Sequence, residues 1–584
     1  MILVDAYGRK YGRQFLVAVA FVTLEAVCDL LQPTIMSRII DVGVAEKNLT
    51  YILHMGSAML GITALGAVFA SVRNIISSRV SQRLGADLRL ELYEKIHSLS
   101  FSTINQLDRS SLLTRLTNDV VQVQNFVNGL MRIFVKAPIL CIGGIIMAVN
   151  LNMHLSLVLV TVVPLVGLLI MLNMKVGFPL FVKVQAAIDK MNGVLREYLS
   201  GVRVVKAFNR FDYEADKFSK VNQNLQGSTI LAMRAMALFS PGVSLTLNIG
   251  IVAVLWLGSQ GVNSGQMQVG QIVAFINYMT QILFSLMIIF MVFNMFVRAE
   301  ASARRIEEVL VRQPGMAWIR EGSSGESEEV VRGTVSFEHV YFSYDQASDD
   351  TVLKNISFVC RPGEVVGIIG TTGAGKTSLV NLIPRFYDAT AGLVAVNGID
   401  VRQVNPAELR EKIAIVPQQT VLFTGTIMDN IRWGKEEASV AEIEAAAVFA
   451  QAHEFISRLP EGYQTQLGQG GVNLSGGQKQ RVSLARALVR KPEILILDDC
   501  TSAVDGETEG KINQAIRQYA RQAACFLVGQ RITSVIAADK ILVMDDGQIV
   551  GAGTHGELLQ TCQVYQEIFQ SQMGKGLNRH AVRK

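Results

Sequence analysis

The sequence predicts a two-part fold: a membrane α-helical bundle of six transmembrane helices with long cytoplasmic extensions, followed by an α/β domain. Three observations carry this prediction, namely the composition, the spacing of charges in the first half, and a change of hydrophobic pattern near residue 334. The chain has 584 residues, of which 50% are hydrophobic and 18% charged, and its mean hydropathy is +0.33. This balance is too apolar for an ordinary soluble protein and too charged for a chain wholly embedded in a membrane.

Long stretches without Asp, Glu, Lys or Arg mark the membrane spans. They cover residues 48–72, 137–174 and 235–297. About 20 apolar residues cross a hydrocarbon core roughly 30 Å thick. The first stretch therefore holds one span, whereas the second and third are long enough for two each and are interrupted by short polar segments. Residues 15–31 add one more, which gives six predicted spans.

Basic residues predict the orientation. The segments 73–136 and 175–234 carry nine and ten Lys or Arg residues, whereas the short turns between the other spans carry only Lys47. By the positive-inside rule, these two segments and both termini face the cytoplasm. Both segments have apolar residues at three-to-four spacing and few helix breakers, so we expect the membrane helices to continue into the cytoplasm. Separate soluble hairpins are the alternative, but no Gly or Pro punctuation separates these segments from the spans.

The domain boundaries follow the composition. Residues 1–315 are the predicted membrane domain, and a polar, Gly/Ser/Glu-rich linker covers 316–333. Short β-branched runs alternate with helical patterns over 334–572, which predicts the α/β domain, and 573–584 is a basic tail. The six cysteines have no paired spacing, which indicates a reduced protein without a disulfide scaffold or zinc site. The net charge of +5 is explained by the cytoplasmic loops, so no nucleic-acid partner is expected.

A glycine-rich loop indicates the chemistry of the second domain. Residues 365–380, VVGIIGTTGAGKTSLV, form a strand, a loop and a helix that fit G-x-x-x-x-G-K-[ST]. Backbone N–H groups of such a loop surround phosphates, Lys376 reaches the outer phosphates, and the Thr377 hydroxyl binds Mg²⁺. Asp498, at the end of an apolar strand, is the expected carboxylate for Mg²⁺. The domain is therefore predicted to be an α/β P-loop nucleotide-binding domain that binds ATP and Mg²⁺. The predicted ATP-binding loop residues are Gly370, Thr371, Thr372, Gly373, Ala374, Gly375, Lys376, Thr377 and Ser378.

A second phosphate-ready helix start lies in NLSGGQKQRVSLARALVRK, residues 473–491. With Leu-Ser-Gly-Gly-Gln just before a paired-Asp strand, the chain resembles the ATP-binding cassette (ABC) transporters over essentially its whole length, and its first half looks like that of the exporters. The resemblance implies an ATP-hydrolysing translocase in which two cassettes sandwich ATP, the signature of one capping the nucleotide on the phosphate loop of the other. The signature residues are Leu474, Ser475, Gly476, Gly477 and Gln478.

The resemblance assigns further residues. Tyr344 would stack on adenine, and Gln418 would contact Mg²⁺ and respond to the membrane domain. Asp505 would lie in the D-loop, which joins the two nucleotide sites. Residues 111–120 and 196–210 look like the intracellular segments that dock on cassettes.

Two positions depart from the family pattern. Asp499 follows Asp498 where the family has the glutamate that orients the attacking water, and Gln530 stands where the family has a histidine that contacts the γ-phosphate. Aspartate is one methylene shorter, and a misplacement of about 1 Å can cost on the order of 100-fold in rate. Glutamine has no proton to give. The chain therefore looks like the degenerate-site subunit of a bacterial heterodimeric multidrug exporter. The alternatives are a homodimeric lipid or peptide exporter and a non-transporting ATP-binding regulatory subunit.

Two acids lie in the first predicted span, Glu25 and Asp29, and their i, i+4 spacing puts them on one helix face. Charges at membrane depth are costly and mark functional sites by default. The pair either forms an acidic patch that attracts cationic substrates, or lies near the membrane edge, where it hydrogen-bonds neighbouring helices or is partly protonated by mutual repulsion. The expected substrates are drugs, lipids or other amphipathic or cationic compounds. The expected partners are a second half-transporter and membrane lipids, and the expected location is the bacterial cytoplasmic membrane.

Overall fold

The structure is a computed structural model that describes residues 2–312, 332–344 and 350–573. Most of the predicted linker at 316–333 lies outside the described residues. The same holds for the predicted basic tail at 573–584, apart from its first residue.

The chain forms two compact units, and the division does not follow the sequence strictly. Ser98–Asp108 belongs to the second unit, with the residues that follow Arg312. The predicted docking segment 111–120 lies in the first unit instead, and 196–210 covers the turn between two long helices of that unit. A short helix inside the predicted membrane domain is therefore part of the second unit.

Six helical stretches among the described residues are long and apolar enough to cross a membrane. They are Tyr7–Val44, Leu49–Ser98, Ser110–Leu151, Met153–Ala207, Phe211–Asn263 and Val269–Val311. The helices α2 and α7 have 50 and 55 residues, whereas about 20 cross the hydrocarbon core. The predicted bundle of six membrane helices with long extensions is confirmed.

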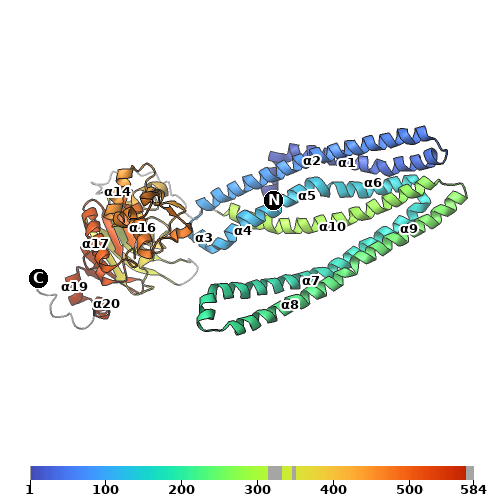
Figure 1. Ribbon diagram of the computed structural model, residues 1–584. Helices are drawn as coiled ribbons and strands as arrows, with labels where there is room; N and C mark the ends of the chain where they lie inside the picture. The colour runs from blue at the N-terminus through green and yellow to red at the C-terminus, as the bar shows by residue number, and fades with distance from the viewer. Residues whose placement is uncertain (1, 313–331, 345–349, 574–584) are drawn as a thin grey trace. The chain divides into compact units, whose positions relative to one another are not determined.

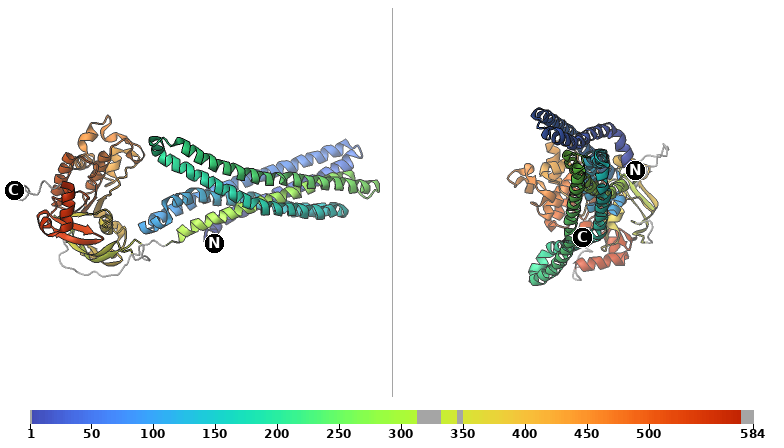
Figure 2. Two further views of the ribbon diagram at one scale, coloured as in Figure 1. Left: turned by 90° about the horizontal axis from the view of Figure 1, so that it is seen from below. Right: turned by 90° about the vertical axis from the view of Figure 1, so that its right-hand side faces the viewer.

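The described residues 2–312 contain ten α-helices, of which α3 belongs to the second unit. In chain order they are α1 (Ile2–Arg38), α2 (Leu49–Ser98), α3 (Phe101–Leu107), α4 (Arg109–Thr114), α5 (Val120–Gly129), α6 (Lys136–Leu151), α7 (Met153–Ala207), α8 (Phe211–Ala237), α9 (Phe239–Asn263) and α10 (Val269–Val311). Short π-helical turns follow α1, α4 and α5 at Ile39–Val44, Arg115–Asp119 and Leu130–Phe134. The helices α7 and α8 run side by side as a long hairpin (Figures 1 and 2), and α10 packs against α1, α5 and α6. Phe275, Tyr278 and Met279 of α10 are fully buried in the apolar core of this unit.

The second unit contains a six-stranded sheet with the order β12-β11-β3-β10-β9-β6 and a four-stranded antiparallel sheet with the order β2-β1-β4-β5. The strands are β1 (Val335–Phe342), β2 (Leu353–Cys360), β3 (Val365–Gly370), β4 (Ala391–Val396), β5 (Ile399–Asp400), β6 (Ile413–Val416), β7 (Gly425–Thr426), β8 (Gln466–Leu467), β9 (Ile494–Asp498), β10 (Ala524–Val528), β11 (Lys540–Asp545) and β12 (Gln548–Gly553). The helices are α11 (Lys376–Leu382), α12 (Pro406–Glu411), α13 (Ile427–Arg432), α14 (Val440–Phe449), α15 (His453–Ser457), α16 (Gly476–Leu488), α17 (Gly506–Ala520), α18 (Ile532–Val535), α19 (His555–Thr561) and α20 (Gln563–Met573).

The strand order explains how distant motifs meet. The strands β3, β10, β9 and β6 are neighbours and run parallel, so their carboxyl ends lie at one edge of the sheet. The glycine-rich loop follows β3, Gln530 follows β10, Asp499 follows β9, and Gln418 follows β6. Ligands of α/β sheets bind outside the carboxyl ends of the strands. This edge is therefore where a site is expected.

Candidate functional site

A cleft of about 330 Å³ lies at this edge of the sheet. Most of its walls are residues that the sequence predicted for one site. They are Tyr344, Thr372, Gly373, Gly375, Lys376, Thr377, Ser378, Gln418, Asp498, Asp499 and Gln530. Val352, Val528 and Gly529, which the sequence did not single out, complete the walls. The fold thus brings together motifs that are far apart in the chain.

The conformation of the glycine-rich loop depends on its glycines. Gly375 has a φ of +90°, which side chains rarely adopt, and a Cβ there would lie 2.8 Å from the Leu353 side chain. The next residue, Lys376, begins α11, and its Nζ donates hydrogen bonds to the carbonyl oxygens of Gly370 at 2.9 Å and Thr371 at 2.7 Å. Burial lowers the pKa of Lys376. The ammonium group is therefore held close to the backbone of the glycine-rich loop.

Two adjacent carboxylates end the buried strand β9. Asp498 is 4% exposed; burial raises its pKa, and a hydrogen bond from Thr377 opposes that rise. Asp499 takes a left-handed backbone conformation with φ +49°. Burial also raises the pKa of Asp499, against the opposing effects of the nearby Arg531 charge and a hydrogen bond from Gln418. The two acids therefore have different partners: Asp498 pairs with the phosphate-loop helix, and Asp499 pairs with groups that follow neighbouring strands.

The signature lies away from this cleft, and none of its five residues lines it. Ser475 caps α16, and its side chain and that of Gln478 form a reciprocal capping box, with N···O distances of 3.4 and 2.9 Å. A Cβ at Gly477 would lie 2.7 Å from the Ala503 carbonyl oxygen. The helix start can therefore approach the segment after Asp499 only with glycine at this position.

Side-chain hydrogen bonds join the signature helix α16 to the segment between Asp499 and Asp505. The Gln480 amide oxygen accepts from the Ala503 N–H at 3.0 Å, and its amide nitrogen donates to the Ser502 hydroxyl at 3.1 Å. That hydroxyl in turn donates to the Asp499 carbonyl oxygen at 3.0 Å. Asp505, the predicted D-loop residue, caps α17 through its side chain. Ser502 and Gln480 therefore link the Asp499 backbone to α16.

An aromatic contact joins Tyr344, in the wall of the cleft, to Tyr387. The Tyr344 ring meets the Tyr387 ring edge-on, with centroids 5.1 Å apart. The Asn105 side chain of α3 donates a hydrogen bond to the Tyr387 hydroxyl at 3.3 Å, and Phe101 of α3 lies 4.9 Å from the Phe386 ring. Nothing in the sequence pointed to Tyr387, because its contact is with Asn105, which lies 282 residues away in the chain. The structure thus connects α3 to Tyr344 through one tyrosine.

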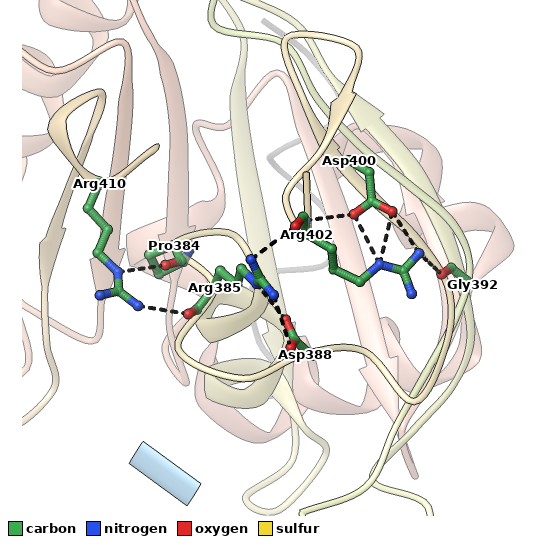
Figure 3. A network of polar contacts seen from close by, with 7 residues as sticks. All are labelled: Pro384, Arg385, Asp388, Gly392, Asp400, Arg402 and Arg410. Carbon is green, nitrogen blue, oxygen red and sulfur yellow. Dashed lines mark hydrogen bonds and ion pairs between the residues drawn. The ribbon is translucent and has the colours of Figure 1, made fainter. Parts of the chain in front are cut away.

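A network of arginines shapes the loop that carries Phe386 and Tyr387 (Figure 3). Arg385, 1% exposed, donates to Asp388 at 2.7 Å and to the Arg402 carbonyl oxygen at 3.2 Å. Arg410 donates at 2.9 Å to the Arg385 carbonyl oxygen. The Arg410 side chain and the Arg402 backbone thereby hold this loop, and its two aromatic residues contact α3.

The structure places the two membrane acids in an ion-pair cluster. Glu25 lies 2.7 Å from the Arg73 guanidinium and 2.5 Å from Lys136 Nζ, and Asp29 lies 2.8 Å from the same Nζ. The Glu25 and Arg73 side chains are each 8% exposed. This arrangement corresponds to the second predicted alternative, in which the acids bind neighbouring helices, and not to an unpaired acidic patch. The sequence did not predict this cluster, because Arg73 and Lys136 border charge-free stretches and were assigned to the cytoplasmic segments.

Comparison with known proteins agrees with this geometry. The ABC transporter transmembrane region family matches residues 15–287, and the ABC transporter family matches residues 353–502. The chain is 40% identical to YfiB, an uncharacterized ABC transporter ATP-binding protein of Bacillus subtilis (strain 168). The match extends over 559 residues and covers 96% of each protein. It is 34% identical over 530 residues to a fatty acid ABC transporter ATP-binding/permease protein of Mycobacterium bovis (strain ATCC BAA-935 / AF2122/97), covering 91% of this chain and 82% of that protein.

Among solved structures, an ATP-bound bacterial Atm1-family ABC exporter superimposes with a TM-score of 0.77. Its sequence identity is 26%, and the match covers 97% of this chain and 99% of that one. Six membrane helices and one nucleotide-binding domain in a single chain, matched along nearly their whole length, show that the protein belongs to the ABC transporters and is an exporter half-transporter.

Proposed function

We propose that this half-transporter exports amphipathic compounds from the cytoplasm or inner leaflet and works as a heterodimer with a different half. Its termini face the cytoplasm of a bacterial cell. The observation that carries the proposal is a single cleft lined by Lys376 and Asp498, which we assign to ATP with Mg²⁺, and also by Asp499 and Gln530, which we assign to the attacking water and the γ-phosphate. ATP binding closes the two cassettes and turns the substrate cavity outward, and hydrolysis, mainly at the partner's site, resets it.

The donor groups of the cleft suit ATP with Mg²⁺. Mg²⁺ takes oxygen ligands and is usually held by one or two carboxylates together with substrate phosphates. The Asp498 carboxylate, the Thr377 hydroxyl and the Gln418 amide all line the cleft, and these groups would hold the ion. When bound, Mg²⁺ neutralises charge on the phosphates. Lys376 and the backbone of its loop bind the phosphates directly.

Hydrolysis at this site is proposed to be slow but not absent. Burial raises the pKa of Asp499, which favours proton acceptance, but the carboxylate stops one methylene short of where a glutamate would reach. A well-placed base contributes roughly 10²–10⁴-fold, and a displacement of about 1 Å costs on the order of 100-fold. Gln530 can donate a hydrogen bond to a phosphate but cannot supply a proton. The shorter base at Asp499 and the missing proton donor at Gln530 weaken the same site.

These losses favour a heterodimer. A homodimer would contain two weakened sites and no strong one, whereas a partner with glutamate and histidine at the positions of Asp499 and Gln530 would supply one strong site. The signature here, from Leu474 to Gln478, would complete that site. Two measurements separate the alternatives. Brisk ATP hydrolysis by the purified chain alone would support a homodimer, and no ATP-dependent flux in vesicles that hold both halves would support a regulatory subunit.

The substrate class rests on two observations. The membrane helices expose many large apolar side chains, as lipid-facing and amphiphile-binding walls do. The relative described as a fatty acid transporter matches this chain over 91% of its length. Acyl-chain amphiphiles and lipophilic drugs are therefore the substrates to test first.

Lys376→Ala should weaken ATP binding at this chain's site by about 10- to 150-fold, because a hydrogen bond to a charged group contributes about 1.5–3 kcal/mol. Azido-ATP labelling of each half in the purified pair measures this. The control is Lys435→Ala, which removes a surface lysine that pairs with Glu442 at 2.8 Å and should leave labelling unchanged. Undiminished labelling of Lys376→Ala in an intact pair would contradict the assignment.

Tyr387→Ala should weaken ATP binding about 2- to 10-fold, because an aromatic pair contributes about 0.5–1.5 kcal/mol and Tyr344 loses its edge-on neighbour. Tyr387→Phe keeps the ring but loses the hydroxyl that Asn105 contacts. It should bind ATP normally while coupling substrate-stimulated ATPase less well. Equal behaviour of the two variants in nucleotide titrations would show that the ring contact does not support Tyr344.

A further inference from the structure

The geometry points to a binding site within one half-transporter for the hydrocarbon chain of an amphiphile. A hollow of about 610 Å³ lies in the membrane domain among α1, α2, α5 and α10. Its walls are mainly apolar, with the rings of Tyr11, Phe15, Phe126 and Phe296 among them. This volume falls within the roughly 300–1,000 Å³ of small-molecule sites, which are concave and lined mostly by apolar and aromatic side chains.

Small residues on two helices create the hollow. Gly8 and Gly12 stand one turn apart on α1, and Ala299 and Ala303 stand one turn apart on α10, and all four line the space. A Cβ built at either glycine meets no atom within 4 Å. Ordinary side chains would fit at these positions and fill the space, so the hollow depends on the side chains that are missing from α1.

The polar groups of the walls already have partners. The Tyr7 hydroxyl donates to Glu91 at 2.5 Å, and the Tyr11 hydroxyl donates to Asp87 at 2.7 Å. Both hydroxyls are thus engaged by α2, which leaves the rings as the part of each tyrosine available to a ligand. The part of the wall that α1, α2 and α5 supply therefore offers a ligand mainly dispersion contacts. Its occupant is therefore a hydrocarbon chain.

Three charged side chains of α10 also line the hollow. Glu300, Arg304 and Glu307 follow one another at four- and three-residue spacing on α10, which puts them on one helix face. Arg304 donates to Glu300 at 2.6 Å. A hydrocarbon chain that ends beside these residues can place an anionic head near the Arg304 guanidinium, or an ammonium head near the Glu300 and Glu307 carboxylates. An acyl chain with a polar head, from a free fatty acid or from a phospholipid, has this chemistry.

The inference goes beyond the proposed function and can fail independently of it. Acyl occupancy needs neither a partner half nor ATP turnover, so it is measured on the purified full-length chain in lipid nanodiscs. The probes are a diazirine-labelled palmitic acid and, separately, a phosphatidylethanolamine with the same labelled chain. After illumination, mass spectrometry locates the labelled peptides.

Gly12→Leu fills the hollow and is expected to lower labelling of the peptides that contain residues 7–15 and 296–307 by at least about ten-fold, a loss equivalent to about 1.4 kcal/mol of binding. It also improves helix propensity, so it should fold. Gly61→Leu is the matched control, because Gly61 is a helical glycine of α2 that also has no atom within 4 Å of its Cβ and does not line the hollow. It should label as the wild type does. Ala303→Phe fills the space from the opposite wall and should repeat the loss.

Labelling by the free acid alone, or by the phospholipid alone, supports the site and identifies the source of the chain. Equal labelling of the wild-type, Gly12→Leu and Ala303→Phe proteins would overturn the inference, as would label found only outside the four helices. If the wild-type chain takes up neither probe while it transports amphiphiles with its partner, the acyl site is wrong and the proposed function stands.

Discussion

Asp499→Asn is expected to lower the ATPase rate of the assembled heterodimer by less than about two-fold, because a weak base is replaced by none. Replacement of the partner's corresponding glutamate should lower the same rate about 10²–10⁴-fold, since a well-placed base contributes that much. Steady-state ATP hydrolysis by the purified pair in lipid measures both. A collapse with Asp499→Asn as deep as that caused by the partner's variant would mean that both sites turn over, and the degenerate-site proposal would be wrong.

The signature supplies the second half of this test. Ser475→Ala removes a side chain that would cap ATP on the partner's loop, so it should resemble the partner's glutamate variant. The chain offers a matched control in Ser439→Ala. Ser439 is the N-cap of α14 and forms the same kind of capping box, with Glu442. Each variant should cost about 0.5–2 kcal/mol of helix stability, but only Ser475→Ala should lower ATPase strongly. Equal effects on ATPase would assign Ser475 a capping role alone.

Glu25→Gln is expected to destabilise the membrane domain by about 3–5 kcal/mol, because it leaves the buried Arg73 without its carboxylate partner. Lys136 keeps a partner in Asp29. The change is measured as the loss of thermal stability of the chain in nanodiscs. Asp29→Asn should cost less, because the Asp29 side chain is 31% exposed and that of Glu25 only 8%.

The double variant Glu25→Gln, Arg73→Met tests the cause. It removes both members of the most buried pair and leaves Lys136 with Asp29, so it should recover most of the stability lost in Glu25→Gln. If the acids instead attract substrates, Glu25→Gln would leave stability unchanged and reduce export of cationic dyes more than that of neutral ones. That result would restore the acidic-patch alternative.

The sequence by itself determined the membrane spans and the phosphate loop, because both are written in local patterns. A stretch of 20 or so residues without charges is a property of consecutive positions, and the loop after β3 depends on glycines at fixed spacing around Lys376. The family resemblance assigned Gln418, Asp499 and Gln530 to one nucleotide site, whereas the strand order that brings them to one sheet edge came from the structure. The structure has all of these groups around one cleft.

Only the tertiary structure decided the partners of residues whose surroundings come from distant helices. The sequence placed Glu25 on a helix face, but its Lys136 partner lies 111 residues away, and nothing in either segment predicts which helices pack together. Tyr387 likewise gains its role from a contact with Asn105 of α3, which lies 282 residues away in the chain. Spacing along one helix reports neighbours three and four residues apart, whereas ion pairs and ring contacts between helices depend on how whole elements pack. The hollow beside Gly12 follows the same rule, since a glycine leaves open space only where the neighbouring helices do not fill it.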